Sequence, residues 1–166
     1  MATDIFLQLA TAPSSQFSGE SVTKGHEREI NVLAFSWGAE QAVTSGARAG
    51  GAGKAQFGAL SVTKYVDRSS PELFGALCSG MHLPTGKLML CRAGGAGLRE
   101  VLRYEFTGLQ VSKVELAVSS GTDASPTENV EFVYSTIKTV YTPFDASGKA
   151  QTAISKGWDV AANRAS

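Results

Sequence analysis

The nine residues Glu29–Trp37, EINVLAFSW, carry the strongest strand signal in the chain. Its side chains alternate between two sets: Ile30, Val32, Ala34 and Ser36 on one face, and Leu33, Phe35 and Trp37 on the other. Both sets are largely apolar, so we expect a β-strand that is covered on both sides.

Further short alternating stretches flank this strand and predict a mainly β architecture. They lie at residues 5–9, 59–66, 87–92, 101–108, 129–142 (one long strand or a strand pair) and 158–160. The glycine-rich stretch 94–97 reads as a hairpin turn, and the alternation changes phase at Gly108, which predicts a bulge there. One helix is expected, with Ser70 as its N-cap, Pro71 in its first turn and Gly80 near its end.

Composition limits the possible classes of protein. A length of 166 residues suits a single domain spanning 1–166. Lys and Arg number 15, as do Asp and Glu, which argues against a nucleic-acid or anionic-membrane partner. The N-terminus has no basic region, so no signal peptide is expected, and the longest uncharged run, residues 5–19, contains Pro13 and cannot span a bilayer. The two cysteines form no disulfide framework and suggest folding in a reducing cytoplasm.

The segment 42–58 is rich in glycine and alanine and has neither a helical nor a strand period. A long loop in a compact domain is usually functional or ordered by a partner. Its Gly50–Lys54 stretch does not fit a phosphate-binding loop, because Arg48 stands where the first glycine belongs and Ala55 where a Ser or Thr belongs. We therefore interpret 42–58 as an extended arm that contacts another subunit.

No motif in the sequence predicts catalysis or metal binding. Four residues could be offered as zinc ligands, but they lack a paired CxxC spacing: His26, Cys78, His82 and Cys91. A serine triad using His26 or His82 lacks the Gly-x-Ser-x-Gly elbow. Scattered cations, Lys64 among them, read as a solvated face or as a rim that meets another subunit. We expect no cofactor, no metal and no enzymatic activity.

An ordered set of short motifs nevertheless resembles one family, the haemolysin-coregulated proteins (Hcp) of bacterial type VI secretion systems. The motifs are Met1-Ala2-x-Asp4-Ile5-Phe6-Leu7, Gly19-Glu20-Ser21, His26-x-x-Glu29-Ile30-x-Val32-Leu33-x-x-Ser36-Trp37-Gly38, Thr63-Lys64-Tyr65-x-Asp67-x-Ser69-Ser70-Pro71-x-Leu73, Cys78-x-x-Gly-x-His82, Arg92-Ala93-Gly94-Gly95, Glu128-Asn129-Val130, Tyr141-x-Pro143 and Gly157-Trp158. They cover nearly the whole chain in the family's order. Pro13 to Phe17 looks like a small insertion, and Cys91 departs from the pattern.

This resemblance implies a two-sheet β-barrel with one short flanking α-helix and a long extended loop, similar to phage tail-tube proteins. It implies a structural subunit of the secretion system's inner tube. Six copies would form a ring, rings would stack, and a contractile sheath would drive the tube, tipped by a spike protein. The expected partners are other copies, the sheath, baseplate and spike proteins, and effectors in the ring lumen. The chain would be cytoplasmic before firing and then secreted, with no C-terminal toxin extension.

Combining the resemblance with the strand pattern gives specific site residues. We expect Leu33, Phe35 and Trp37 to face the core, with Ala34 and Ser36 facing the lumen. The arm residues expected at the subunit interface are Arg48, Gly50, Gly51, Gly53 and Lys54. Two alternatives remain open: a soluble β-barrel carrier or chaperone for a secreted effector, distinguished by the absence of rings, and an enzyme on a barrel scaffold, which would need converging polar groups in a pocket.

Overall fold

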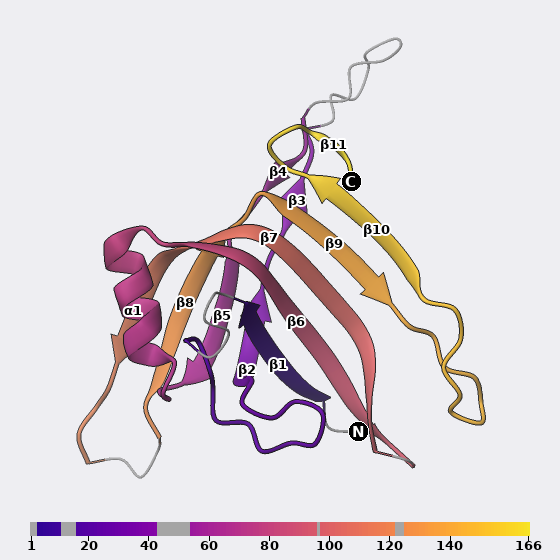
Figure 1. Cartoon of the computed structure of the whole chain (residues 1–166), viewed down its shortest axis with the longest axis horizontal. Helices are drawn as coiled ribbons and strands as arrows, with labels where there is room; N and C mark the ends of the chain where they lie inside the picture. Colours follow the sequence, from indigo (N-terminus) through magenta and orange to yellow (C-terminus); the bar gives the residue numbers. More distant parts are fainter. Residues whose placement is uncertain (1–2, 11–15, 43–53, 96, 122–124) are drawn as a thin grey trace.

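A computed structural model describes residues 3–10, 16–42, 54–95, 97–121 and 125–166. The elements, labelled in Figure 1, are β1 (Thr3–Ala10), β2 (Ile30–Ser36), β3 (Ala39–Glu40), β4 (Gln56–Phe57), β5 (Leu60–Tyr65), α1 (Ser70–Ser79), β6 (His82–Gly94), β7 (Gly97–Ala117), β8 (Thr127–Val133), β9 (Thr136–Tyr141), β10 (Ile154–Asp159) and β11 (Arg164–Ala165). The chain is mainly β, as predicted, and the region 129–142 is a strand pair.

The main sheet has the strand order β11-β10-β9-β7-β6-β1-β2-β5-β8, and a further pairing of β7 with β8 closes it. A six-stranded antiparallel barrel of β1, β2, β5, β8, β7 and β6 results, with β9, β10 and β11 extending the sheet beyond it. Strand β7 joins the two parts, because its residues 102–107 pair with β9 and its residues 110–117 pair with β8. The stretch 94–97 is the β6–β7 turn, as predicted.

The phase change predicted at Gly108 has a different cause from the expected bulge. Gly108 adopts a left-handed conformation with φ of 59°. The register against β6 stays the same on both sides of it, with Thr85 opposite Thr107 and Leu83 opposite Leu109. A Cβ at Gly108 would lie 2.5 Å from Ser135 Oγ, so the site favours glycine for space as well as for conformation.

Strand β2 corrects two predictions. Its register against β5 shifts between Val32 and Ala34, so the inward face changes parity at this point. Ile30 and Val32 are buried before the shift, and Phe35 and Trp37 pack against the core after it, the latter two as predicted. The prediction for Leu33 is wrong, because its side chain is 44% exposed. The strand is also open on one face, since Ala34 and Ser36 are exposed.

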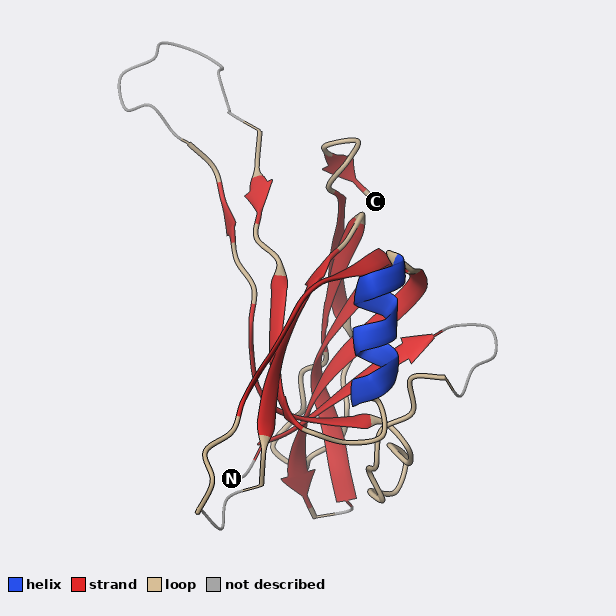
Figure 2. Ribbon diagram, turned by 90° about the vertical axis from the view of Figure 1, so that its left-hand side faces the viewer, coloured by secondary structure: helices blue, strands red, loops and turns tan. Residues whose placement is uncertain are grey.

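Helix α1 lies along one flank of the barrel (Figure 2). Its N-cap is Ser69, one residue before the predicted Ser70, and Gly80 ends it in a left-handed conformation with φ of 67°. Leu73 and Ala76 face the barrel and are buried. Among the described residues, no helix is both long and apolar enough to cross a membrane.

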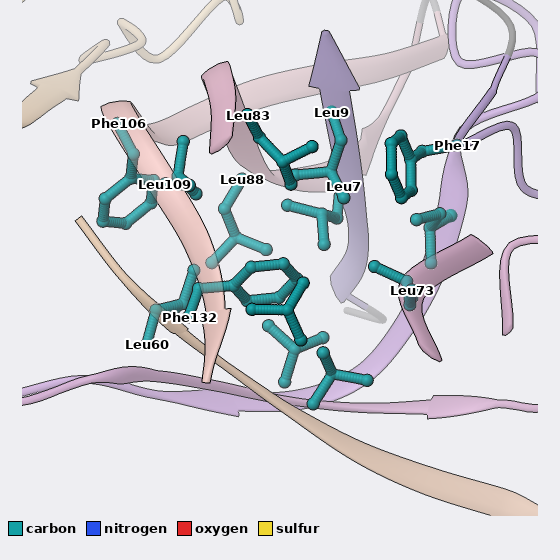
Figure 3. Packing of buried hydrophobic residues seen from close by; sticks show 14 of the residues in the cluster. Leu7, Leu9, Phe17, Leu60, Leu73, Leu83, Leu88, Phe106, Leu109 and Phe132 are labelled. Atoms are coloured by element: carbon teal, nitrogen blue, oxygen red, sulfur yellow. The ribbon is translucent and has the colours of Figure 1, made fainter. Parts of the chain in front are cut away.

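The barrel interior holds one large apolar cluster (Figure 3). Its fully buried members include Leu7, Ile30, Leu60, Leu73, Leu88 and Phe132, each from a different element. A second, smaller cluster of Phe6, Met89 and Cys91 lies apart from it, with Leu98 packed alongside. Because Phe6 and Leu7 are neighbours in β1, and Leu88 and Met89 are neighbours in β6, these two strands bury side chains on both faces.

Candidate functional site

The outward faces of β2, β5, β8 and residues 110–117 of β7 form a continuous surface, which we call the wall. Two rows of facing residues cross it: Ala34, Thr63, Asn129 and Glu115 in one row, and Ser36, Ser61, Glu131 and Lys113 in the other. Between these rows, Val62 and Val130 are fully buried in the barrel, and Phe35 and Val114 are partly buried against its core. The wall therefore presents small and polar side chains on one side and the core on the other.

Hydrogen bonds tie the middle of the wall together. The hydroxyls of Ser61 and Thr63 both donate to Asn129 Oδ1, at 3.1 and 3.2 Å. These bonds link β5 to β8 across the wall surface. Ala34 and Ser36, the predicted lumen residues, lie on β2 beside them and are exposed.

Among the residues of the two rows, the charged ones all lie on β8 and β7. Lys113 Nζ lies 3.1 Å from Glu115 Oε2 and 3.9 Å from Glu131 Oε1. The hydrogen bond that Lys113 donates to Glu115 and the negative charges of Glu115 and Glu131 raise the pKa of Lys113. The sequence could not reveal this group, because Lys113 and Glu131 are brought together by strand pairing between distant segments.

The inward side of the wall contains a buried ionic network centred on Lys64. Its Nζ lies 2.6 Å from Glu128 Oε1 and 2.9 Å from Asp67 Oδ1, and it donates to the Tyr65 carbonyl at 2.8 Å. Ser70 Oγ completes the network by donating to Glu128 at 2.7 Å. Lys64 is fully buried, so its interpretation as a solvated or rim cation is wrong. The network fastens β5, β8 and the start of α1 to one another.

Only the base of the predicted arm lies within the described residues. There, β3 pairs with β4, and the Gly58 N–H donates to the Gly38 carbonyl at 2.8 Å. This short ribbon projects from one end of the barrel (Figures 1 and 2). Lys54 is exposed at its base. The other predicted arm residues fall outside the described residues: Arg48, Gly50, Gly51 and Gly53.

The structure brings together two of the four residues weighed as metal ligands. Cys91 Sγ lies 3.5 Å from His26 Nε2, and His26 Nδ1 lies 2.8 Å from Glu29 Oε2. Cys78 is exposed on α1, and His82 is exposed at the start of β6. Within the described part of the chain, no three His, Cys, Asp or Glu side chains are grouped so as to hold a metal ion.

The Cys91–His26–Glu29 arrangement resembles a nucleophile, base and orienting acid in outline only. Burial, and to a smaller extent the nearby carboxylates of Glu100, Glu29 and Asp4, raise the pKa of Cys91 to about 11. A thiol with so high a pKa is a poor nucleophile at neutral pH. The His26 ring instead stacks on Phe6, with ring centroids 4.2 Å apart. The group therefore attaches residues 17–29 to the outer face of β1 and β6.

Comparison with known proteins points to one family. The family model described as "Type VI secretion system effector, Hcp" matches residues 6–141. "Protein hcp1" of Pseudomonas aeruginosa is 38% identical over 165 residues, covering 98% of each chain. A solved type six secretion system protein superposes with a TM-score of 0.89 at 32% identity, covering 99% of this chain and 100% of its own. Hcp1 from Salmonella typhimurium gives 0.79 at 34% identity, covering 100% of both chains.

Proposed function

The chain belongs to the Hcp family of type VI secretion systems, and from this we propose that six copies close into a ring whose lumen is lined by the wall. The family is structural and not enzymatic, and its members are secreted tube proteins. Our proposal for this chain concerns the number of copies in the ring, the residues that line its lumen and the contacts between copies.

The observation that carries this proposal is the open face of the wall. Ala34 and Ser36 have small, exposed side chains, while the opposite face of the same strands is buried. Short side chains on a lining strand leave a wide bore, and polar ones keep it wetted. A face of this kind suits the inner surface of a tube through which folded cargo passes.

Unpaired strand edges suggest how the ring closes. Residues 34–36 of β2 pair with β5 on one edge, and no described strand pairs with their other edge. Residues 111–117 of β7 pair with β8 on one edge and likewise have no described strand on the other. A ring needs two different, complementary patches on each subunit. These two edges lie at opposite ends of the wall and could supply them.

The wall assignment is tested by Ser36→Gln, with Ser155→Gln on the exposed β10 as the matched control. We expect Ser36→Gln to lower the retention of effector cargo, because a longer side chain narrows the bore, while hexameric rings persist. Cargo co-purification and light scattering on a sizing column measure the two effects. Loss of rings in Ser36→Gln would show that this residue lies at a subunit contact and not in the lumen.

The arm is proposed to contact a neighbouring subunit, because its base projects away from the barrel. Deleting residues 47–53 is expected to leave a folded subunit that fails to form or stack rings. Far-UV circular dichroism checks folding, and light scattering with negative-stain imaging checks assembly. A deletion variant that still runs as stacked hexamers would exclude the arm as a contact. A wild-type chain that stays monomeric at high concentration would favour the soluble carrier instead.

The remaining partners follow from the same tube. We propose that sheath proteins surround it, that a baseplate and a spike protein meet its ends, and that effectors occupy its lumen. The subunit would assemble in the cytoplasm and leave the cell with the tube. No nucleic-acid or stable membrane contact is part of this function.

A further inference from the structure

We propose that the wall selects cargo by charge, and that Glu115 and Glu131 make it a docking surface for a basic, arginine-bearing face of an effector. This inference rests on the proposed ring, because only a ring turns the wall into a lumen, and it names the chemistry of the cargo that the lumen would hold. Three observations carry it: the net charge of the wall, the carboxylate oxygens that remain open on it, and the hydrogen-bond donors beside them.

The two rows of the wall carry an unbalanced charge. Glu115 and Glu131 are acidic, Lys113 is basic and the other row residues are neutral, so two negative charges against one positive charge leave each copy with a net charge of −1. All three charges lie on the half of the wall formed by β8 and β7, whereas the half formed by β2 and β5 is neutral. In the proposed ring, acidic and neutral stripes would therefore alternate around the bore.

Lys113 neutralises its two acidic neighbours only in part. Its ammonium lies 3.1 Å from Glu115 Oε2 and 3.9 Å from Glu131 Oε1. Glu115 Oε1 and Glu131 Oε2 have no hydrogen-bond or ion-pair partner among the described residues. The side chain of Glu115 is 59% exposed and that of Glu131 is 31% exposed, so both carboxylates are open to a ligand. A carboxylate with an open oxygen can accept N–H donors from a guanidinium, which makes short, charge-assisted hydrogen bonds.

Asn129, which lies directly opposite Glu115 in its row, supplies donors beside these acceptors. Ser61 and Thr63 both donate to Asn129 Oδ1, at 3.1 and 3.2 Å, which fixes the orientation of the amide. Asn129 Nδ2 therefore keeps both N–H groups, and neither has an acceptor within the described part of the chain. These N–H groups can bind a main-chain carbonyl, and the neighbouring carboxylates can bind a guanidinium. A peptide segment that bears arginine offers both groups together.

Each of these contacts is weak by itself, because an exposed ion pair is screened by water and salt. A basic cargo that touches several copies of the wall would combine the contacts, and its affinity would rise steeply with the number of copies touched. An acidic cargo would be repelled by the same stripes, so the wall discriminates between the two. Repeated weak contacts would hold a cargo in the ring and still allow it to leave.

Binding of two matched peptides tests the charge preference. The probes are fluorescein-labelled peptides of equal length, one of repeated Gly-Ser-Arg units and one of repeated Gly-Ser-Glu units, and fluorescence anisotropy measures their binding to hexamers identified by light scattering. At about 50 mM NaCl the arginine peptide should bind at least about tenfold more tightly, and about 300 mM NaCl should reduce this preference at least about threefold. Equal affinities on intact hexamers would overturn the charge selection and leave the ring standing. A wild-type chain that forms no hexamers would overturn the ring and with it this inference.

Variants with opposite expected effects show where the arginine peptide binds. Glu115→Gln combined with Glu131→Gln should weaken its binding at least about fivefold, whereas Lys113→Gln should strengthen it at least about twofold, because the charges left on the wall are then all negative. The matched control is Glu27→Gln combined with Glu72→Gln, which removes the same charge from exposed side chains away from the wall and should bind as the wild type does. An equal loss in the control would show that the charge of the whole subunit governs binding, and would overturn the assignment to the wall.

Hexamer formation separates a role in the lumen from a role in ring closure. Glu115 lies on residues 111–117 of β7, whose open edge is proposed to meet a neighbouring copy, but its side chain points to the wall face, like that of Asn129 opposite. We therefore expect the double variant Glu115→Gln/Glu131→Gln to form hexamers as readily as the wild type, by light scattering. Loss of hexamers in this variant alone would place the two residues at a subunit contact and overturn their role in selecting cargo.

Discussion

The wall and the layer formed by β1 and β6 differ in how far their outer faces are covered. Both layers bury aliphatic side chains inside the barrel. Outside, the wall exposes Ala34 and Ser36, whereas β1 and β6 carry Phe6, Met89 and Cys91 beneath the 17–29 loop. A strand covered on both faces serves the fold of its own chain. A strand covered on one face leaves the other free for assembly or cargo, which supports the proposed role of the wall.

The largest expected effect contrasts the two sides of the wall. Lys64→Met should lower the free energy of unfolding by about 3–5 kcal/mol, because it leaves the carboxylates of Glu128 and Asp67 buried without their cation. Lys113→Met, which removes an exposed cation from the outer side, should change it by less than about 1 kcal/mol. Urea denaturation measures both. Equal losses would show that the wall's outer face also supports the fold.

The next prediction sharpens the contrast within β2 itself. Ile30→Ala should cost about 2–5 kcal/mol, because its side chain is fully buried and its loss leaves a cavity. Leu33→Ala, three residues later, should cost less than about 1 kcal/mol, because Leu33 lies at the register shift and is exposed. Thermal and urea unfolding of the two variants would reveal the difference. A large loss of stability in Leu33→Ala would mean that Leu33 faces the core, as the alternation of the sequence predicts.

The register shift in β2 shows where reasoning from the sequence reaches its limit. Alternation correctly placed Phe35 and Trp37 inside and left Ala34 and Ser36 outside. It failed at Leu33, because the shift is set by pairing with β5, which lies far along the chain and has no signal in the local pattern. The helix was found within one residue, since Pro71 and Gly80 act locally.

The site follows the same rule. Ala34 and Ser36 could be proposed from one strand and a family resemblance. Their neighbours in the two rows, Asn129, Glu131 and Lys113, needed the pairing of β5 with β8 and of β8 with β7. Lys64 was misread for a related reason. A lysine in an alternating strand looks solvent-facing until Glu128, 64 residues away, is placed beside it.

The smallest effect concerns the covered face of β6 and depends on pH. Burial and nearby carboxylates raise the pKa of Cys91 to about 11. An acid whose pKa is raised in the folded state contributes its full stabilisation at any pH where it is protonated in both the folded and the unfolded state. The contribution is therefore complete below about pH 8.5, the usual thiol pKa, and is lost as the pH rises towards 11.

Wild type should thus lose about 1–2 kcal/mol more stability between pH 8 and 10.5 than Cys91→Ala does. Iodoacetamide at pH 8 provides the parallel test, because exposed Cys78 should react while Cys91 stays unmodified. Mass spectrometry after digestion assigns the modified thiol, and Cys78→Ala is the matched control. Alkylation of Cys91 at the rate of Cys78 would mean that the 17–29 loop leaves this face often. In that case the two layers would not differ in how their outer faces are covered.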